Sequence, residues 1–240
     1  MSTSLSEATI LVPVNAKEPG TPSPSLIKLL GPHSVVVLGY YPVPDQSSTD
    51  QLRSQFGEEV TAEVAEIASQ FEGEGGSVES VVVFTRDRNE TIDNIAAKYE
   101  ADAVLTTGIV SESLDTILVP LRGDQNLGRI VAFISLLARN RDTNVTLFNV
   151  AESEADAPEG EFILRGASDR LEEDGIDPEH IEWKQVIGDS PSTEIIDAAG
   201  EYDLLVVGES EPSLRERILG AVTNEVIRQS PRPVLVVRSN

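Results

Sequence analysis

The chain carries the phrase TILVPVNAKEPG at residues 9–20 and nearly repeats it as TILVPLRGDQNLG at residues 116–128. Both copies open with an apolar run rich in β-branched residues and then turn polar. An apolar run without polar alternation is typical of a parallel strand that is buried on both faces of its sheet. We therefore predict that each phrase forms the first strand of a sheet of its own.

The residues after each phrase alternate between apolar strands and helical segments in the same order. In the helix predicted over 49–71, the apolar side chains are spaced to form one face, and the glycines of GEGG at 73–76 end it. The predicted strands cover 10–14, 34–44, 78–84, 102–108, 117–121, 144–150, 181–187, 203–208 and 233–237, and the predicted helices cover 49–71, 90–100, 127–139, 162–175, 192–202 and a segment within 209–230.

This order indicates an α/β fold of two domains, each a parallel sheet with helices on both faces. The predicted domains are residues 8–110 and 116–240, and the first lacks the last helix and strand of the second. The closing phrases ETIDNIAAKYEADAVLTTG (90–108) and PSTEIIDAAGEYDLLVVG (191–208) also correspond. We therefore interpret the two halves as products of a duplication. The sequence leaves open whether the Pro- and Gly-rich segment 19–25 is ordered.

Composition excludes several classes of function. The chain of 240 residues has 41 acidic and 18 basic residues, a net charge of −23, and only four lysines (Lys17, Lys28, Lys98 and Lys184). Such a surface repels nucleic acids and anionic membranes, since it offers phosphates few cations. No apolar run approaches the ~20 residues of a membrane span, so we expect a cytoplasmic protein. The acid-rich, lysine-poor composition resembles that of proteins from salt-accumulating halophiles.

Few residues offer catalytic or metal chemistry. The absence of cysteine excludes disulfides, thiolate catalysis and cysteine-ligated zinc. The two histidines, His33 and His180, lack partners at metal-ligand spacing, so we expect both at the surface and no metal site. Ser210, in GESEP, lacks the second glycine of a nucleophile elbow. We therefore predict no catalytic residue and no enzyme activity, apart from slow ATP hydrolysis if a nucleotide binds.

The stretch DLLVVGESEPSLRERILGAVTNEVIRQSPRPVLVVR at 203–238 resembles the last third of a universal stress protein domain. The resemblance extends over residues 116–240 and is weaker over 8–110. It implies a tandem form of this family with a truncated first repeat, built from Rossmann-like domains of the adenine nucleotide alpha hydrolase-like type. In such proteins the last strand commonly pairs across a dimer axis, so the closing strand PVLVV implies a homodimer.

The resemblance also implies where a nucleotide would bind. ATP-binding members carry G-x-x-G, nine residues, then Gly with Ser or Thr, and an aspartate after the first strand that holds the adenosine. Gly208 matches the first glycine, but Glu211 replaces the second, and Ala221 follows Gly220 after a spacer of only eight residues. The expected aspartate is Asn15 in the first repeat and Arg122 in the second.

These departures argue against ATP as a cofactor. Glu209 and Glu211 would bring two carboxylates toward a triphosphate, where like charges repel. Arginines and helix-start amides would partly offset this repulsion. If ATP does bind, the candidate residues are Gly208, Gly220, Ala221, Thr223, Arg215, Arg217 and Arg122.

Three functions follow from these observations. The first is a non-catalytic stress-response or regulatory protein that acts by binding a partner or by dimerising. The second is a sensor of ATP or another nucleotide, with a divergent phosphate loop in the second repeat. The third is a regulator of a membrane amino-acid transporter, because universal stress domains also occur fused to permeases.

Overall fold

The computed structural model describes residues 7–106, 112–123, 126–139, 141–209 and 221–239. The chain divides into two compact units, one of Glu7–Leu105 and one that contains Thr106–Asn240. The predicted domains are 8–110 and 116–240, and residues 107–111, at the predicted end of the first, lie outside the described residues. Those boundaries therefore stay a prediction.

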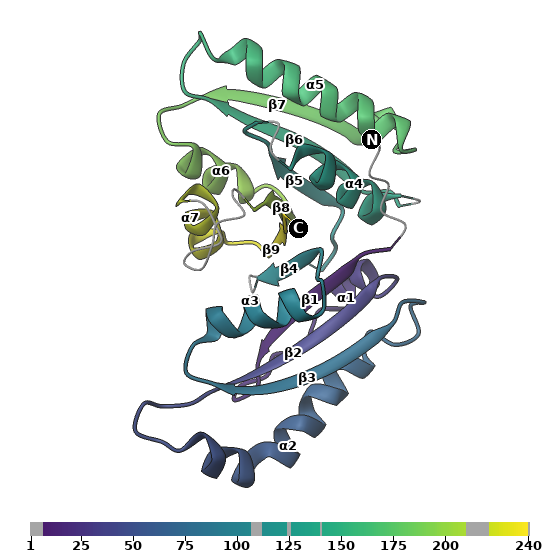
Figure 1. Ribbon diagram of the computed structural model, residues 1–240. Helices are drawn as coiled ribbons and strands as arrows, with labels where there is room; N and C mark the ends of the chain where they lie inside the picture. Colours follow the sequence, from purple (N-terminus) through teal and green to yellow (C-terminus); the bar gives the residue numbers. More distant parts are fainter. Residues whose placement is uncertain (1–6, 107–111, 124–125, 140, 210–220, 240) are drawn as a thin grey trace. The chain divides into compact units, whose positions relative to one another are not determined.

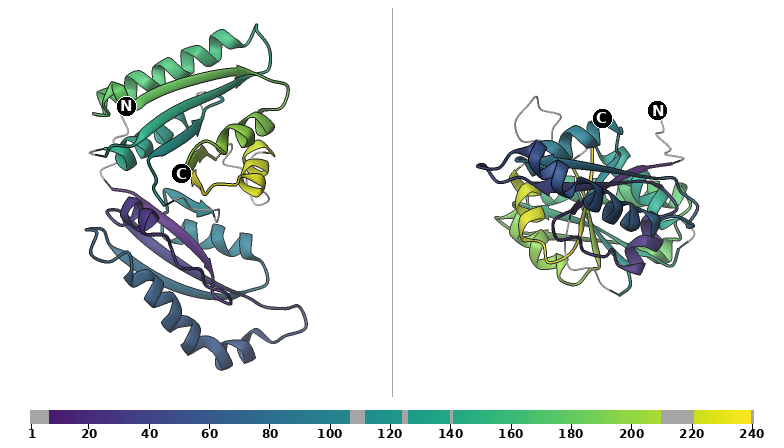
Figure 2. Two further views of the ribbon diagram at one scale, coloured as in Figure 1. Left: turned by 180° about the vertical axis from the view of Figure 1, so that it is seen from behind. Right: turned by 90° about the horizontal axis from the view of Figure 1, so that it is seen from below.

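The unit Glu7–Leu105 contains a parallel sheet in the strand order β3-β2-β1-β4 (Figures 1 and 2). The pattern of apolar residues predicted most of these elements but not α1. The side chain of Ser23 caps the start of this helix by accepting the N–H of Leu26 at 3.2 Å. Its elements are β1 (Thr9–Asn15), α1 (Pro24–Leu30), β2 (Ser34–Pro42), α2 (Thr49–Ser69), β3 (Val78–Thr85), α3 (Arg88–Lys98) and β4 (Ala103–Thr106).

Two of these helices cover opposite faces of this sheet. On one face Leu11, Val36 and Leu38 are buried together with Ala96 of α3. Successive strand residues point to opposite faces, so Gly39 belongs to the other face. A side chain at Gly39 would overlap Val64 of α2, so α2 packs closely over that second face.

The second unit has the same plan with one more helix and one more strand. Its sheet runs in the order β9-β8-β5-β6-β7, and all pairs are parallel. Its elements are β5 (Thr116–Pro120), α4 (Leu127–Ala138), β6 (Asn144–Ala151), α5 (Ala157–Glu173), a 3₁₀ turn (Pro178–His180), β7 (Ile181–Ile187), α6 (Pro191–Ala199), β8 (Leu204–Gly208), α7 (Ala221–Gln229) and β9 (Val234–Val237). The predicted α/β fold with parallel sheets and flanking helices is confirmed.

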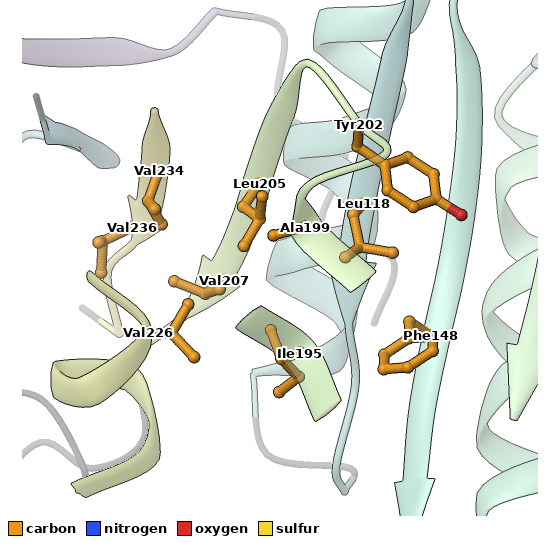
Figure 3. Packing of buried hydrophobic residues seen from close by; sticks show 10 residues of the cluster. All are labelled: Leu118, Phe148, Ile195, Ala199, Tyr202, Leu205, Val207, Val226, Val234 and Val236. Carbon is orange, nitrogen blue, oxygen red and sulfur yellow. The ribbon is translucent and has the colours of Figure 1, made fainter. Parts of the chain in front are cut away.

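One core of the second unit lies between its sheet and the helices α6 and α7. Figure 3 shows Ile195 and Ala199 of α6 and Val226 of α7 facing the side chains of β5, β6, β8 and β9. The ten buried residues of this core are Leu118, Phe148, Ile195, Ala199, Tyr202, Leu205, Val207, Val226, Val234 and Val236. This core fixes α7 against the end of β8, where the candidate nucleotide site was predicted.

The two sheets share strand register as well as order. Thr9 lies opposite Ser34 as Thr116 lies opposite Asn144, and each phrase TILVP pairs along its length with the next strand. An aspartate before the neighbouring strand binds the start of each phrase. Asp102 accepts the N–H of Thr9 at 2.9 Å.

In the second unit, Asp203 takes the corresponding place. Its Oδ2 accepts the N–H of Asp115 at 3.0 Å, and the N–H and Oγ1–H of Thr116 at 3.1 and 2.9 Å. Hydrogen bonds to a charged acceptor are stronger than those between neutral groups. We infer that these bonds hold the first strand in register with β8.

Two predictions need correction. The helix expected over 162–175 begins at Ala157, because Pro158 and Glu159 suit the first turn of a helix, which lacks internal N–H partners and favours negative charge. His33 is buried, with 6% of its surface exposed, although we expected it at the surface. Close backbone packing at Gly76 covers the carbonyl of His33. His180 is half-buried, with Nδ1 3.0 Å from Oδ1 of Asn144.

We expect Asp203→Ala to lower the free energy of unfolding by about 2 kcal/mol, because it leaves two backbone N–H groups and one hydroxyl without their charged acceptor. Chemical unfolding followed by circular dichroism measures the loss. Asp197→Ala, an exposed position on α6, is the control and changes stability by less than about 0.5 kcal/mol. Equal effects of the two variants would contradict the role given to Asp203.

Candidate functional site

The candidate site lies at the carboxyl end of β8, where open α/β sheets commonly bind ligands. Of the seven residues predicted to bind a nucleotide, Gly208, Ala221, Thr223 and Arg122 belong to the described residues, although the side chain of Ala221 is not described. Gly220, Arg215 and Arg217 lie outside the described residues, as do Glu211 and Ser210. The structure therefore describes only the part of the predicted site that β5, β8 and α7 form, and the site as a whole stays a prediction.

Gly208 is required by packing. A Cβ at this position would lie 2.6 Å from Cδ1 of Ile130, a buried residue of α4. The glycine thus allows α4 to pack directly on the end of β8. This contact explains Gly208 without any ligand, so the match to the first glycine of the family pattern is weaker evidence for a phosphate loop than it was in the sequence.

The side chain of Glu209 binds the segment that follows β9. Its side chain is buried, with 5% of the residue exposed, and its Oε2 accepts the N–H and the Oγ–H of Ser239 at 2.8 and 3.0 Å. Its own N–H donates to the carbonyl of Val237 at 2.8 Å. The expectation that the Glu209 carboxylate faces a triphosphate is therefore wrong, because the carboxylate binds the segment after β9.

Thr223 lies beside Gly208. It is buried in the first turn of α7, and its Oγ1 lies 3.5 Å from the carbonyl oxygen of Gly208. Asn126, which precedes α4, donates its side-chain N–H to the carbonyl of Glu209 at 2.9 Å. The starts of α4 and α7 therefore both lie near the end of β8.

Arg122 follows β5, and its side chain binds Glu152. Its guanidinium donates to Oε1 of Glu152, after β6, at 2.9 Å. Both side chains are more than half exposed, so this ion pair contributes little stability. The ion pair matters for binding instead, because the position after β5, where the resemblance implies an aspartate, holds a cation that is paired with a carboxylate. Asn15, the equivalent residue after β1, uses its Oδ1 to accept the N–H of Lys17 at 3.1 Å.

Sequence reasoning missed two asparagines that shape this end of the sheet. Asn149 is buried in β6, where its Nδ2 donates to the carbonyl of Leu121 at 2.8 Å and its Oδ1 accepts Nε2 of Gln185 at 3.0 Å. The polar amide in the apolar strand NVTLFNV was the available signal. Asn126 adopts a left-handed backbone (φ 59°), which asparagine tolerates better than most residues. Asn149 thus binds the carbonyl of the residue before Arg122, and Asn126 binds the carbonyl of Glu209.

The described residues contain no group of three or more His, Cys, Asp or Glu side chains placed to hold a metal ion. None of the helices described here combines the length and apolar character needed to cross a membrane.

The model of the universal stress protein family matches residues 113–238, which is more than half of the chain. The chain belongs to the universal stress protein family. No curated protein matches the sequence.

Two solved structures match nearly the whole length of the chain, and a third matches about half of it. A universal stress protein from Archaeoglobus fulgidus DSM 4304 has a TM-score of 0.63 at 17% identity, over 97% of each chain. A protein of unknown function from Pseudomonas aeruginosa PAO1 has a TM-score of 0.58 at 15% identity, over 97% of this chain and 93% of that one. A universal stress protein in complex with cAMP is 29% identical over 53% of this chain and 98% of that one, with a TM-score of 0.45.

We expect Gly208→Ala to destabilise the protein by about 1–3 kcal/mol, because the new methyl group displaces Ile130 in a packed core. Ile130→Val removes the contacting Cδ1 and costs about 1 kcal/mol alone. We expect the double variant to lose less stability than the sum of the losses of the two single variants. Chemical unfolding in a double-mutant cycle measures the difference. Strictly additive losses would show that Ile130 is not the reason for the glycine.

Proposed function

We propose that this chain is a non-catalytic cytoplasmic stress-response protein that acts by binding a protein partner or by self-association. The observation that carries this proposal is the ion pair of Arg122 with Glu152, 2.9 Å long. The resemblance implies an aspartate at this position to hold adenosine. Arginine reverses the charge at this position. The hydrogen bond from Asn149 to the carbonyl of Leu121 fixes the backbone just before it.

The buried state of Glu209 supports the same proposal. Its carboxylate joins the end of β8 to Ser239, so the backbone after β8 is tied to the last strand. A phosphate loop needs free backbone amides that approach the ligand. Here the first amide of the loop, that of Glu209, already donates to Val237.

We further propose that residues 8–110 and 116–240 are two copies of one ancestral domain, of which the first has lost its last helix and strand. The equivalent contacts of Asp102 with Thr9 and of Asp203 with Thr116 support this duplication.

A second function, a sensor of ATP or another nucleotide, is favoured by Thr223. Its buried hydroxyl lies 3.5 Å from the Gly208 carbonyl, at the start of a helix whose N-terminal amides favour anions. In this alternative the phosphates contact the segment that contains Arg215, Arg217 and Gly220.

Calorimetric titration with ATP and Mg²⁺ decides between the two functions. We propose a halophilic source from the charge of −23, so the titration is done in molar KCl, where salt screens the repulsion between carboxylates over ~3 Å. The first proposal expects no heat of binding up to millimolar ATP. Heat that saturates near one ATP per chain would contradict it and support the sensor.

A matched pair of variants then locates any nucleotide that binds. Thr223→Val removes the hydroxyl beside Gly208 with little change of shape and is expected to weaken binding at this site. Ser192→Ala removes a hydroxyl that bonds Glu225 on the neighbouring helix and serves as the control. Equal affinities of both variants would place the nucleotide elsewhere.

A further inference from the structure

The strand β7 (IEWKQVI) leaves one edge of its sheet open. It stands last in the strand order, and within the described residues no strand pairs with its outer edge. Gly188, directly after β7, donates its N–H to Ala151 of β6 at 3.0 Å. Backbone groups of successive residues alternate between the two edges of a strand. The N–H and C=O groups of Ile181, Trp183 and Gln185 therefore point to the open edge, where they can pair with another strand.

Exposed apolar side chains gather on this strand and on the helix beside it. The three large hydrophobic side chains that are exposed among the described residues are Phe162, Trp183 and Ile187, at 79%, 43% and 55%. Phe162 belongs to α5, whose first turn binds β7 through a 2.8 Å hydrogen bond from Gln185 to Ala157. Trp183 and Ile187 share a face of β7, because side chains alternate along a strand.

The opposite face of β7 carries one charge of each sign. Glu182 and Lys184 are both exposed and lie two residues apart, so they share this face. The Nζ of Lys184 lies 3.1 Å from the hydroxyl of Tyr202, and this hydrogen bond raises the pKa of Lys184 above its usual value.

We propose that a second copy of this chain pairs antiparallel with the open edge of β7, about a two-fold axis that passes through Trp183. In this arrangement Trp183 exchanges two backbone hydrogen bonds with the partner's Trp183. Glu182 then lies opposite the partner's Lys184, and Lys184 opposite the partner's Glu182. The surface differs from the closing strand β9, through which the family resemblance implies a dimer.

Geometry favours this axis over its neighbours. Trp183 directs its backbone groups outward, so the flanking Glu182–Lys184 pairs occupy the non-hydrogen-bonded positions, where facing side chains are closest. An axis through Lys184 would place two lysines opposite each other. An axis through Gln185 would place Lys184 opposite Val186 and form no ion pair.

Charge also identifies the partner as a copy of this chain. Two chains of net charge −23 repel each other, and an edge that pairs two copies needs cations at the contact. The edge of the other sheet lacks them: β3 reads VESVVVFT, with Glu79 exposed and no basic residue. A two-fold pairing of β3 would therefore gain no ion pair, whereas β7 is complementary to itself.

Charge reversal tests the proposal with the full chain at one fixed concentration of KCl. Sedimentation equilibrium measures the dissociation constant of the dimer. Glu182→Lys and Lys184→Glu each place like charges opposite one another twice per dimer, and each is expected to weaken dimerisation about tenfold. The double variant restores both ion pairs with their signs exchanged and is expected to return the constant to the wild-type value. Glu79→Lys, on the β3 edge, is the control and leaves it unchanged.

Each other result overturns the proposal. A chain that stays monomeric at every concentration forms no such dimer. A dimer that neither single variant weakens uses another surface, such as β9. Single variants that weaken a dimer which the double variant does not restore would show that these residues do not face each other. Circular dichroism confirms that each variant is folded. If Lys184→Glu does not fold, the test rests on Glu182→Lys, which leaves the contact between Lys184 and Tyr202 in place.

Discussion

Each unit depends on a first strand that is buried on both faces and paired on both edges. Ile10 and Leu11 in β1, and Ile117 and Leu118 in β5, are fully buried. A slip of one residue in such a strand would exchange every side chain between two different cores. The hydrogen bonds of Asp102 and Asp203 to the first residues of these strands fix the register, and the positions of the loops that follow the strands depend on it.

The apolar pattern was enough to predict the fold because burial on both faces leaves few polar residues inside a strand. The strands β1, β5 and β8 are near-continuous apolar runs, and their order along the chain indicated parallel pairing. Helix starts were harder to predict. The apolar face of α5 suggested a start near Phe162, but the helix begins at Ala157, where proline and acidic residues suit a first turn and add nothing to an apolar pattern.

The candidate site was predicted less completely, because the direction of a side chain depends on contacts distant in sequence. Glu209 follows β8 in a loop that reads as polar and exposed, yet its carboxylate is buried on Ser239, thirty residues later. Gly208 matched a phosphate-binding pattern, yet a contact with Ile130 of α4 accounts for it. No local pattern distinguishes a glycine needed by a ligand from a glycine needed by a neighbouring helix.

The net charge of a chain also says little about where its charged side chains lie, so association has to be judged from the position of each charge. A net charge of −23 suggests that copies of this chain avoid each other, and only four of the 18 basic residues that oppose it are lysines. One of the four, Lys184, stands in an edge strand beside an exposed tryptophan and two residues from a glutamate. An edge strand that merely avoided association would gain from more carboxylates, in keeping with the rest of the surface. A cation at this place instead lowers the repulsion at an edge where exposed apolar side chains and outward backbone groups coincide.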